Sequence, residues 1–326
     1  MLSICTLTWD QIELTKKFIA TIKKNTTVPY ELIMVDNGSQ DRSIDIAKKF
    51  PVQAIEKRGG TIGSVRNFGV GFSTGEILAF VDADCVVAQD WVMSFLKYFE
   101  NKNTEVGIVG APPCVPLNAN LIQRAWFSHR KDNFVDQVEY VGSANLIISR
   151  ALFNVVGGFD ENIPSGEDFD LCSRVKTRGY KVISDYRIVS YHYGYPSNTV
   201  EFIKREIWHG KGMIVDFKKP LKSRPLMLSF LYLFLNIIII YSIAMLVREK
   251  NNLFLNLVIT LFGIELFPVV LLSLHKAIQR KSVTYLPMLT YLYYIYGMAR
   301  SYSLMLIIYE YVIGFFDKII KRYRAN

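Results

Sequence analysis

The sequence predicts an α/β domain, with a mostly parallel sheet flanked by helices, followed by an α-helical membrane module. Residues 1–110 alternate short apolar runs with helical patterns, which is typical of βαβ units. Residues 226–247 then run for 22 positions without a charged side chain. The charge divides at the same place: residues 1–202 contain 21 Lys and Arg against 23 Asp and Glu, and residues 203–326 contain 17 against 6.

The elements expected in the first part follow one another with short connections, which favours a parallel sheet. Ligands of such sheets bind beyond the carboxyl ends of the strands, where the sequence places Asp36, Asp82 and Asp84. Strands are expected at 2–8, 32–35, 52–56, 77–81 and 106–109, and helices at 10–24, 41–50, 64–72 and 90–99.

Composition and motifs narrow the class of protein. The chain of 326 residues is 51% hydrophobic with a formal net charge of +9, which excludes a disordered chain, a collagen and a coiled coil. Its four cysteines form no close pair, which argues against a disulfide scaffold or a CxxC site. There is no GxxxxGK[ST] motif, and Gly69, Gly71 and Gly75 lack GxGxxG spacing, which argues against nucleotide loops of those two kinds. The basic excess lies among apolar runs, which indicates a membrane module rather than nucleic-acid binding.

Two acidic clusters are candidates for chemistry. The apolar run 77–81 ends at Asp82-Ala83-Asp84, and two carboxylates at this spacing suit Mg²⁺ or Mn²⁺, which would neutralise a diphosphate leaving group. The alternative is a solvated acidic loop. Glu167, Asp168 and Asp170 open a predicted helix over 169–178, where acids either complement the helix dipole or supply a general base.

Five short segments together carry a resemblance to a known family. In chain order they are 35–39 (VDNGS), 63–69 (GSVRNFG), 81–84 (VDAD), 157–161 (GGFDE) and 166–168 (GED). In this order and rough spacing, residues 2–192 resemble the family 2 inverting glycosyltransferases of the GT-A fold. The resemblance implies the nucleotide-diphospho-sugar transferase fold, with Mn²⁺ or Mg²⁺ as cofactor.

The resemblance also implies a role for each matching residue on the donor side. Thr8 and Asp36 would bind the base and ribose of a nucleotide sugar, and Arg66 would contact the base or the diphosphate. Asp84 would ligate the metal ion, and Asp82 would contact the sugar, the ribose or the ion. His192 stands where many members carry a histidine near the metal, although a lone histidine is more often structural.

On the acceptor side, Asp168 would be the catalytic base, with Ser143, Asn145 and Glu167 lining the acceptor. The implied mechanism is a single in-line displacement that inverts the sugar anomer. Two departures from the family are visible. Trp9-Asp10 stands where members often have Tyr-Asn, and no Gln-x-x-Arg-Trp motif precedes the membrane helices, which argues for adding one sugar rather than polymerising.

The apolar runs 226–247 and 253–274 are each long enough to cross a bilayer, and the second is interrupted only by Glu265. Five residues connect them, so we expect a helical hairpin; the alternative is a pair of buried soluble helices. Basic residues before and after the hairpin place residues 1–225 in the cytosol by the positive-inside rule. Residues 1–9 show no signal-peptide pattern.

The stretch 283–316 contains Arg300, Glu310 and eight tyrosines, which favours an interfacial or re-entrant helix over a third span. Glu265 is either a functional acid or a structural one, which would pair with Arg300 or face the helix bundle. Asn198 and Glu201 form a capping box that starts a helix toward Asp216, expected at the membrane interface or else packed on the domain.

We therefore predict four regions: a GT-A catalytic domain (1–200), an interfacial helix and linker (201–225), a transmembrane hairpin (226–274), and a third hydrophobic segment with a basic tail (275–326). The predicted protein is a multi-pass membrane enzyme with a cytosolic catalytic domain. It would transfer one sugar from a nucleotide-diphosphate sugar, UDP being the commonest type in the family, to a lipid-linked acceptor. The alternatives are a polyprenyl-phosphate glycosyl synthase and a non-catalytic membrane scaffold.

Overall fold

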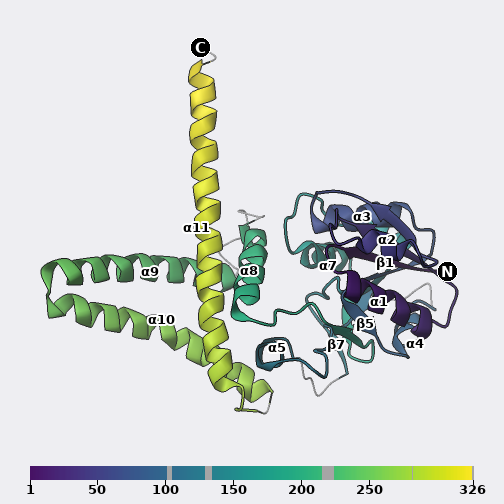
Figure 1. Ribbon diagram of the computed structural model, residues 1–326, viewed down its shortest axis with the longest axis horizontal. Helices are drawn as coiled ribbons and strands as arrows, with labels where there is room; N and C mark the ends of the chain where they lie inside the picture. The colour runs from purple at the N-terminus through teal and green to yellow at the C-terminus, as the bar shows by residue number, and fades with distance from the viewer. Residues whose placement is uncertain (101–104, 129–133, 215–223, 281, 325–326) are drawn as a thin grey trace. The chain divides into compact units, whose positions relative to one another are not determined.

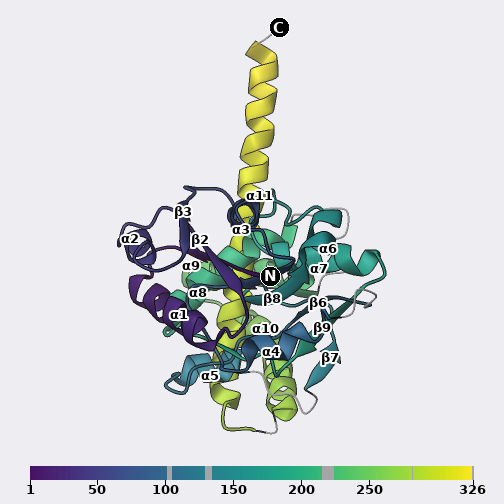
Figure 2. The same cartoon turned by 90° about the vertical axis from the view of Figure 1, so that its right-hand side faces the viewer.

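The computed structural model describes residues 1–100, 105–128, 134–214, 224–280 and 282–324. The chain forms two compact units (Figures 1 and 2). The first contains residues 1–119 and 127–195, and the second contains residues 120–126 and 196–326. The sequence shows no sign that residues 120–126 belong with the C-terminal part.

The first unit is built on an eight-stranded sheet of order β3-β2-β1-β4-β8-β6-β9-β7. The pairs β1–β2, β1–β4, β2–β3 and β6–β9 are parallel, whereas β8 runs antiparallel between β4 and β6 and β7 is antiparallel to β9. The α/β class is confirmed, with a mixed sheet. The strands are β1 Leu2–Thr8, β2 Tyr30–Asp36, β3 Gln53–Glu56, β4 Ile77–Val81, β6 Val106–Gly110, β7 Val135–Gln137, β8 Asn145–Ser149 and β9 Lys181–Asp185.

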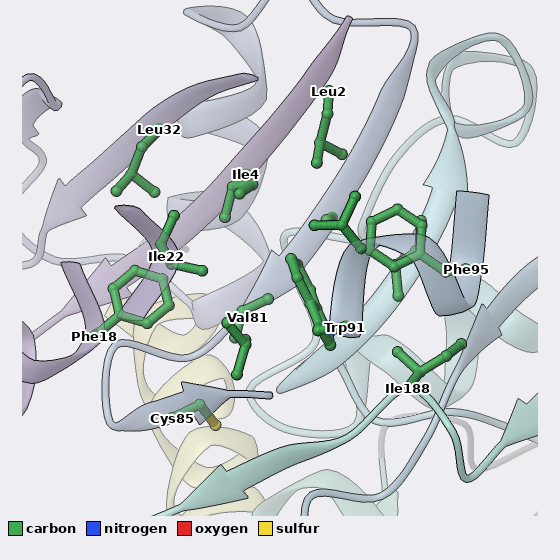
Figure 3. Packing of buried hydrophobic residues seen from close by; sticks show 14 of the residues in the cluster. Leu2, Ile4, Phe18, Ile22, Leu32, Val81, Cys85, Trp91, Phe95 and Ile188 are labelled. Carbon is green, nitrogen blue, oxygen red and sulfur yellow. The ribbon is translucent and has the colours of Figure 1, made fainter. Parts of the chain in front are cut away.

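Helices cover both faces of this sheet, which explains why its central strands read as nearly continuous apolar runs. On one face, Phe18 and Ile22 pack with Ile4, Trp91 and Phe95 (Figure 3). Alternate residues of the same strands face the second core, which includes Cys5, Phe80, Phe153 and Leu171. The helices of this unit are α1 Ile12–Asn25, α2 Ser43–Ala47, α3 Ile62–Gly71, α4 Trp91–Leu96, α6 Arg150–Val155 and α7 Glu167–Thr177.

A two-stranded sheet stands beside the large one and brings distant residues together. It pairs β5 (Cys85–Val87) antiparallel to β10 (Ser190–His192), with Cys85 opposite His192. Because β5 starts directly after Asp84, this register carries His192 to the end of β4.

The second unit is helical. It contains most of α5 (Leu121–Phe127), then α8 (Thr199–Gly210), a 3-10 turn η1 (Lys211–Ile214), α9 (Arg224–Glu249), α10 (Asn252–Gln279) and α11 (Leu286–Arg324). Figure 1 shows α9 and α10 as two arms of a hairpin. Asn198 caps α8 by accepting a hydrogen bond from the N–H of Glu201 (3.0 Å), so the predicted helix start is confirmed, while Asp216 lies outside the described residues.

Two helices are long and apolar enough to cross a membrane, by length and composition: Leu226–Glu249 and Asn252–Gln279, with mean hydropathies of 2.5 and 2.4. Only 22% of each apolar window is buried inside the structure. Helices that are apolar all round and leave most of that surface uncovered suit a lipid environment. Over the side chains that the structure describes, α11 does not pass the same test, and it continues as one helix through Arg300 and Glu310.

Several polar residues of this unit have partners within it. Glu265 is buried and accepts a hydrogen bond from the Asn236 side chain (2.6 Å), so it faces the helix bundle. The alternative that Glu265 pairs with Arg300 is wrong, because Arg300 donates to Glu206 of α8 (2.8 Å). The ion pair, together with the Ser303 hydroxyl that donates to the Ile207 carbonyl (2.8 Å), joins α8 to α11.

Candidate active site

The candidate site lies at the carboxyl ends of β1 and β4, within the first unit. A pocket there is lined by Leu7, Trp9, Gln11, Ile62, Arg66, Asp82, Ala83 and Asp84. This is the sheet edge at which ligands of such folds bind. The pocket combines an exposed aromatic ring with charged groups of both signs.

Thr8 and Asp36 end neighbouring strands and are paired in the β1–β2 register. Both side chains are buried. The Asp36 carboxylate accepts hydrogen bonds from the N–H groups of Gly38 (3.2 Å) and Ser39 (3.0 Å), and Gly38 has a positive φ of 86° that favours glycine. The Thr8 hydroxyl lies 2.8 Å from that of Thr15. Their donor-binding role stays a prediction, and in this structure both hold the loop and the helix next to the strands.

Asp82, Asp84 and His192 converge. The Nε2 atom of His192 lies 3.5 Å from Oδ1 of Asp84 and 4.0 Å from Oδ2 of Asp82. The His192 ring stacks on Tyr195 with centroids 4.2 Å apart, and its Nδ1 atom is buried with no hydrogen-bond partner among the described residues. Two carboxylates and one imidazole form a donor set that fits Mn²⁺ or Mg²⁺.

Asp84 and Cys85 are both buried beside His192, yet only the carboxylate suits such an ion. Burial raises the pKa of the Asp84 carboxyl, although His192 opposes the rise. Burial likewise raises the pKa of the Cys85 thiol well above its usual value, so the thiol stays protonated at neutral pH. Mn²⁺ and Mg²⁺ are hard ions that prefer oxygen ligands to sulfur, so we place Asp84 rather than Cys85 in the donor set.

Arg66 connects the two acidic clusters. This buried residue of α3 donates from Nη2 to Asp82 (2.9 Å) and from Nη1 to Glu167 (2.5 Å). The sequence assigns Arg66 to the base or the diphosphate, whereas the structure shows its guanidinium spanning two carboxylates at the pocket wall. This link fixes the position of Asp82 relative to the start of α7.

Asp168 is the second residue of α7 and is held by two backbone donors. The N–H of Phe169 donates to its Oδ1 (2.8 Å) and the N–H of Ser143 donates to its Oδ2 (3.2 Å). Burial raises the pKa of the Asp168 carboxyl to about 6; the charge of Glu167 adds to the rise and Arg66 opposes it. A carboxylate with a pKa near the working pH is suited to accept a proton from an attacking hydroxyl.

The residues predicted for the acceptor side fall into two groups. Ser143 and Glu167 are buried next to Asp168, and the Ser143 hydroxyl lies 3.4 Å from Glu167 Oε1. Asn145, in contrast, is inside the sheet, where its amide accepts from Trp91 and donates to the carbonyls of Ala111 and Ile188. The side-chain oxygen and nitrogen of Asn145 are both engaged in hydrogen bonds inside the sheet. The structure therefore gives Asn145 a structural role, and it is not part of the proposed acceptor side.

The sequence assigned no site role to two residues, Trp9 and Gly194. Trp9 lines the pocket and is 61% exposed, and its position directly after β1 was the available signal. No sequence motif pointed to Gly194 as a residue of the site. A Cβ on Gly194 would lie 1.8 Å from Oδ2 of Asp84, so only glycine leaves room for that carboxylate in its present position.

The mixed sheet with helices on both faces is the fold of the GT-A glycosyltransferases. Residues 3–156 match the family model described as Glycosyl transferase family 2. Residues 3–156 therefore carry a family 2 glycosyltransferase domain, and the resemblance seen in the sequence is confirmed over this segment.

Individual relatives agree with this assignment. Glycosyltransferase AglE of Haloferax volcanii is 27% identical over 195 residues, which are 57% of this chain and 63% of that protein. The glucosyl-dolichyl phosphate glucuronosyltransferase of the same organism is 22% identical over 174 residues, 49% of this chain and 55% of that protein. The chain thus spans less than two thirds of the length of these curated relatives.

A solved structure supports the fold. The mannosyltransferase PcManGT from Pyrobaculum calidifontis, in complex with GDP-Man and Mn²⁺, superposes with a TM-score of 0.55 over 92% of this chain and 86% of that one. Its sequence identity is 17%.

Proposed function

We propose that this protein is a membrane-anchored, metal-dependent inverting glycosyltransferase that adds one sugar to a lipid-linked saccharide. The observation that carries the proposal is the convergence of Asp82, Asp84 and His192 at one end of the pocket, with Arg66 connecting this group to Glu167 beside Asp168. The first group suits a cation that holds a diphosphate, and the second offers a base.

On the donor side, Asp84, Asp82 and His192 would hold the divalent ion, which supplies charge that stabilises a nucleoside diphosphate as it leaves. The structural neighbour solved with GDP-Man and Mn²⁺ supports a nucleotide sugar and a divalent ion here. Trp9, exposed in the pocket, offers a flat apolar surface for the donor, and Arg66 keeps Asp82 in place. Thr8 and Asp36 form the strand ends against which the nucleoside would bind. We expect UDP as the nucleotide because it is the commonest in the family.

On the acceptor side, Asp168 would take the proton from the acceptor hydroxyl as that oxygen attacks the anomeric carbon. The bond from that carbon to the diphosphate oxygen breaks in the same step, which inverts the anomer. The two N–H groups that donate to Asp168 orient its carboxylate, and Glu167 cannot replace it because its own charge is already paired with Arg66.

The enzyme would act at a membrane, anchored there by its second unit. The two apolar helices of the second unit support a multi-pass anchor, and the basic residues around them support a cytosolic catalytic domain. A relative whose name states a glucosyl-dolichyl phosphate acceptor supports a saccharide carried on a lipid. If α11 lies at the interface, its ion pair with α8 would hold that helix there too.

The test has two parts. Purified protein is screened by thermal shift against nucleotide sugars with Mn²⁺ or Mg²⁺, and a ligand bound to the native state raises the melting temperature. Asp168→Asn is then expected to retain this shift while transfer falls by about 10²- to 10⁴-fold, the usual size of a general-base contribution.

The outcomes separate the alternatives. A polyprenyl phosphate acceptor is already ionised and needs no base, so full transfer by Asp168→Asn would favour a polyprenyl-phosphate glycosyl synthase. No thermal shift with any donor would instead favour a non-catalytic scaffold.

A further inference from the structure

Two aromatic side chains of the first unit form an exposed pair that the proposed mechanism does not use. Phe169 is the third residue of α7, and Tyr140 lies in the segment between β7 and β8. Their ring centroids are 5.7 Å apart with the planes at 67°, and each residue is 53% exposed. Exposed aromatic rings that lie together, rather than scattered singly, indicate a binding surface.

The pair lies beside the proposed base. Phe169 follows Asp168 in the chain, and its N–H donates to Asp168 Oδ1 (2.8 Å). On the other side, the N–H of Ser143 donates to Oδ2 (3.2 Å), and a Cβ on Gly142 would lie 3.6 Å from that same oxygen. Tyr140 precedes this stretch by two residues. Each of the two segments that hold the Asp168 carboxylate therefore carries one ring of the pair.

The chemistry of the aromatic pair favours a sugar ring over a phosphate as the group that it binds. An aromatic face carries partial negative charge, and the C–H groups on one side of a pyranose ring carry partial positive charge, so the two stack favourably. A phosphate needs cationic or N–H donors instead. Two arginines near the pair are already engaged, since Arg66 pairs with Asp82 and Glu167, and Arg174 pairs with Asp170 (2.6 Å).

We propose that Tyr140 and Phe169 form a stacking platform for the acceptor sugar, so that the group attacking the donor is a pyranose hydroxyl rather than a lipid phosphate. The sugar would stack on the face of one ring, with the second ring packed edge-on beside it, and present one hydroxyl to Asp168. The two aromatic residues would then determine acceptor specificity, whereas the pocket around Trp9 and Asp84 holds the donor. This inference rests on the proposed function, since it assigns the acceptor of the same site.

The test uses the full-length protein in detergent, the donor found by thermal shift, and two kinds of acceptor. The sugar probes are the methyl glycosides of glucose, galactose, mannose and N-acetylglucosamine, and the phosphate probe is citronellyl phosphate in the same detergent. The variants are Phe169→Ala, Phe169→Tyr and Tyr140→Ala. Phe72→Ala is the matched control, because Phe72 is also a 43% exposed member of an edge-to-face pair, with Phe68 at 5.0 Å.

We expect wild-type protein to glycosylate at least one methyl glycoside. Phe169→Ala and Tyr140→Ala should raise the KM for that glycoside by about tenfold, the size of one aromatic contact, while the KM for the donor and its slow hydrolysis by water stay unchanged. Phe169→Tyr should restore the acceptor KM, and Phe72→Ala should behave as wild type. Unchanged donor hydrolysis shows that the alanine variants are folded.

Two results would overturn the platform alone: an acceptor KM in Phe169→Ala equal to that of wild type, or transfer to citronellyl phosphate with none to the glycosides. A wild-type protein that neither binds nor consumes any nucleotide sugar would overturn the proposed function and the platform with it.

Discussion

The two acidic pairs of the first unit have the same side-chain chemistry and different surroundings. Asp84, with Asp82, faces an imidazole across 3.5 Å and opens on the pocket. Glu167 pairs with Arg66, whereas Asp168 accepts from two N–H donors and has a pKa raised to about 6, mainly by burial. The neighbours of these acids, rather than their residue type, are therefore what separates the proposed cation ligands from the proposed base.

The largest effect is expected from the metal-binding pair. Asp84→Asn removes a charged ligand, and since a bound ion stabilises the leaving diphosphate by several kcal/mol, transfer should fall by roughly a thousandfold. The thermal shift that depends on Mn²⁺ and donor should vanish, as measured by metal titration. An unchanged metal titration would remove Asp84 from the donor set.

The link between the two pairs is tested by Arg66→Met. Glu167 would then be buried without its partner, and breaking a buried ion pair from one side costs about 3–5 kcal/mol. We expect a clear drop in the melting temperature. Arg66→Met with Glu167→Gln is the control, since removing both charges should recover part of the loss. Equal melting temperatures of wild type and the single variant would contradict the link.

The base is tested by pH. Asp168 accepts a proton only when ionised, and its pKa is raised to about 6, so transfer should be full above pH 7 and should fall about tenfold per unit below pH 6. The measurement is the pH profile of kcat/KM at saturating metal. A profile that is flat down to pH 4.5 would mean that Asp168 is not the group that takes the proton.

The smallest effect is expected at Gly194. In Gly194→Ala the added methyl would meet the Asp84 carboxylate, which must shift, so the Kd for Mn²⁺ should rise severalfold while the fold persists. Gly71→Ala is the matched control, because a Cβ there meets nothing within 4 Å and alanine stabilises a helix by roughly 0.5–1 kcal/mol. Equal metal affinity in the two variants would show that the Asp84 carboxylate is not confined by its neighbour.

Much of the fold could be predicted because local patterns carry it. The strands at 2–8 and 77–81 appear with those bounds, since apolar runs between turn residues leave little choice of structure. The helix expected at 10–24 appears at Ile12–Asn25, because Phe18 and Ile22 share one apolar face. The antiparallel insertion of β8 was not predicted, since strand order depends on contacts that are distant in the sequence.

In the candidate site, too, some features could be predicted from local sequence and others depend on distant contacts. Asp82 and Asp84 are two positions apart in the sequence and follow a strand, so their position at the sheet edge could be inferred. The family resemblance implied an acceptor-side role for Asn145, whereas the structure buries its amide, which donates to two carbonyls and accepts from an indole N–H. The opposite charges of Arg300 and Glu265 suggested an ion pair. In the structure Arg300 instead donates to Glu206, and Glu265 accepts from Asn236.

By itself, the sequence determined the α/β domain, the two apolar helices and the acids available for chemistry, because periodicity, run length and spacing are local properties of the chain. Only the tertiary structure decided which acids act together. The pairing of β5 with β10 brings His192 to Asp84 across more than one hundred residues, and Arg66 connects Asp82 to Glu167 over a similar separation. Such contacts form only when the packed core fixes the strand order, and no local pattern records them.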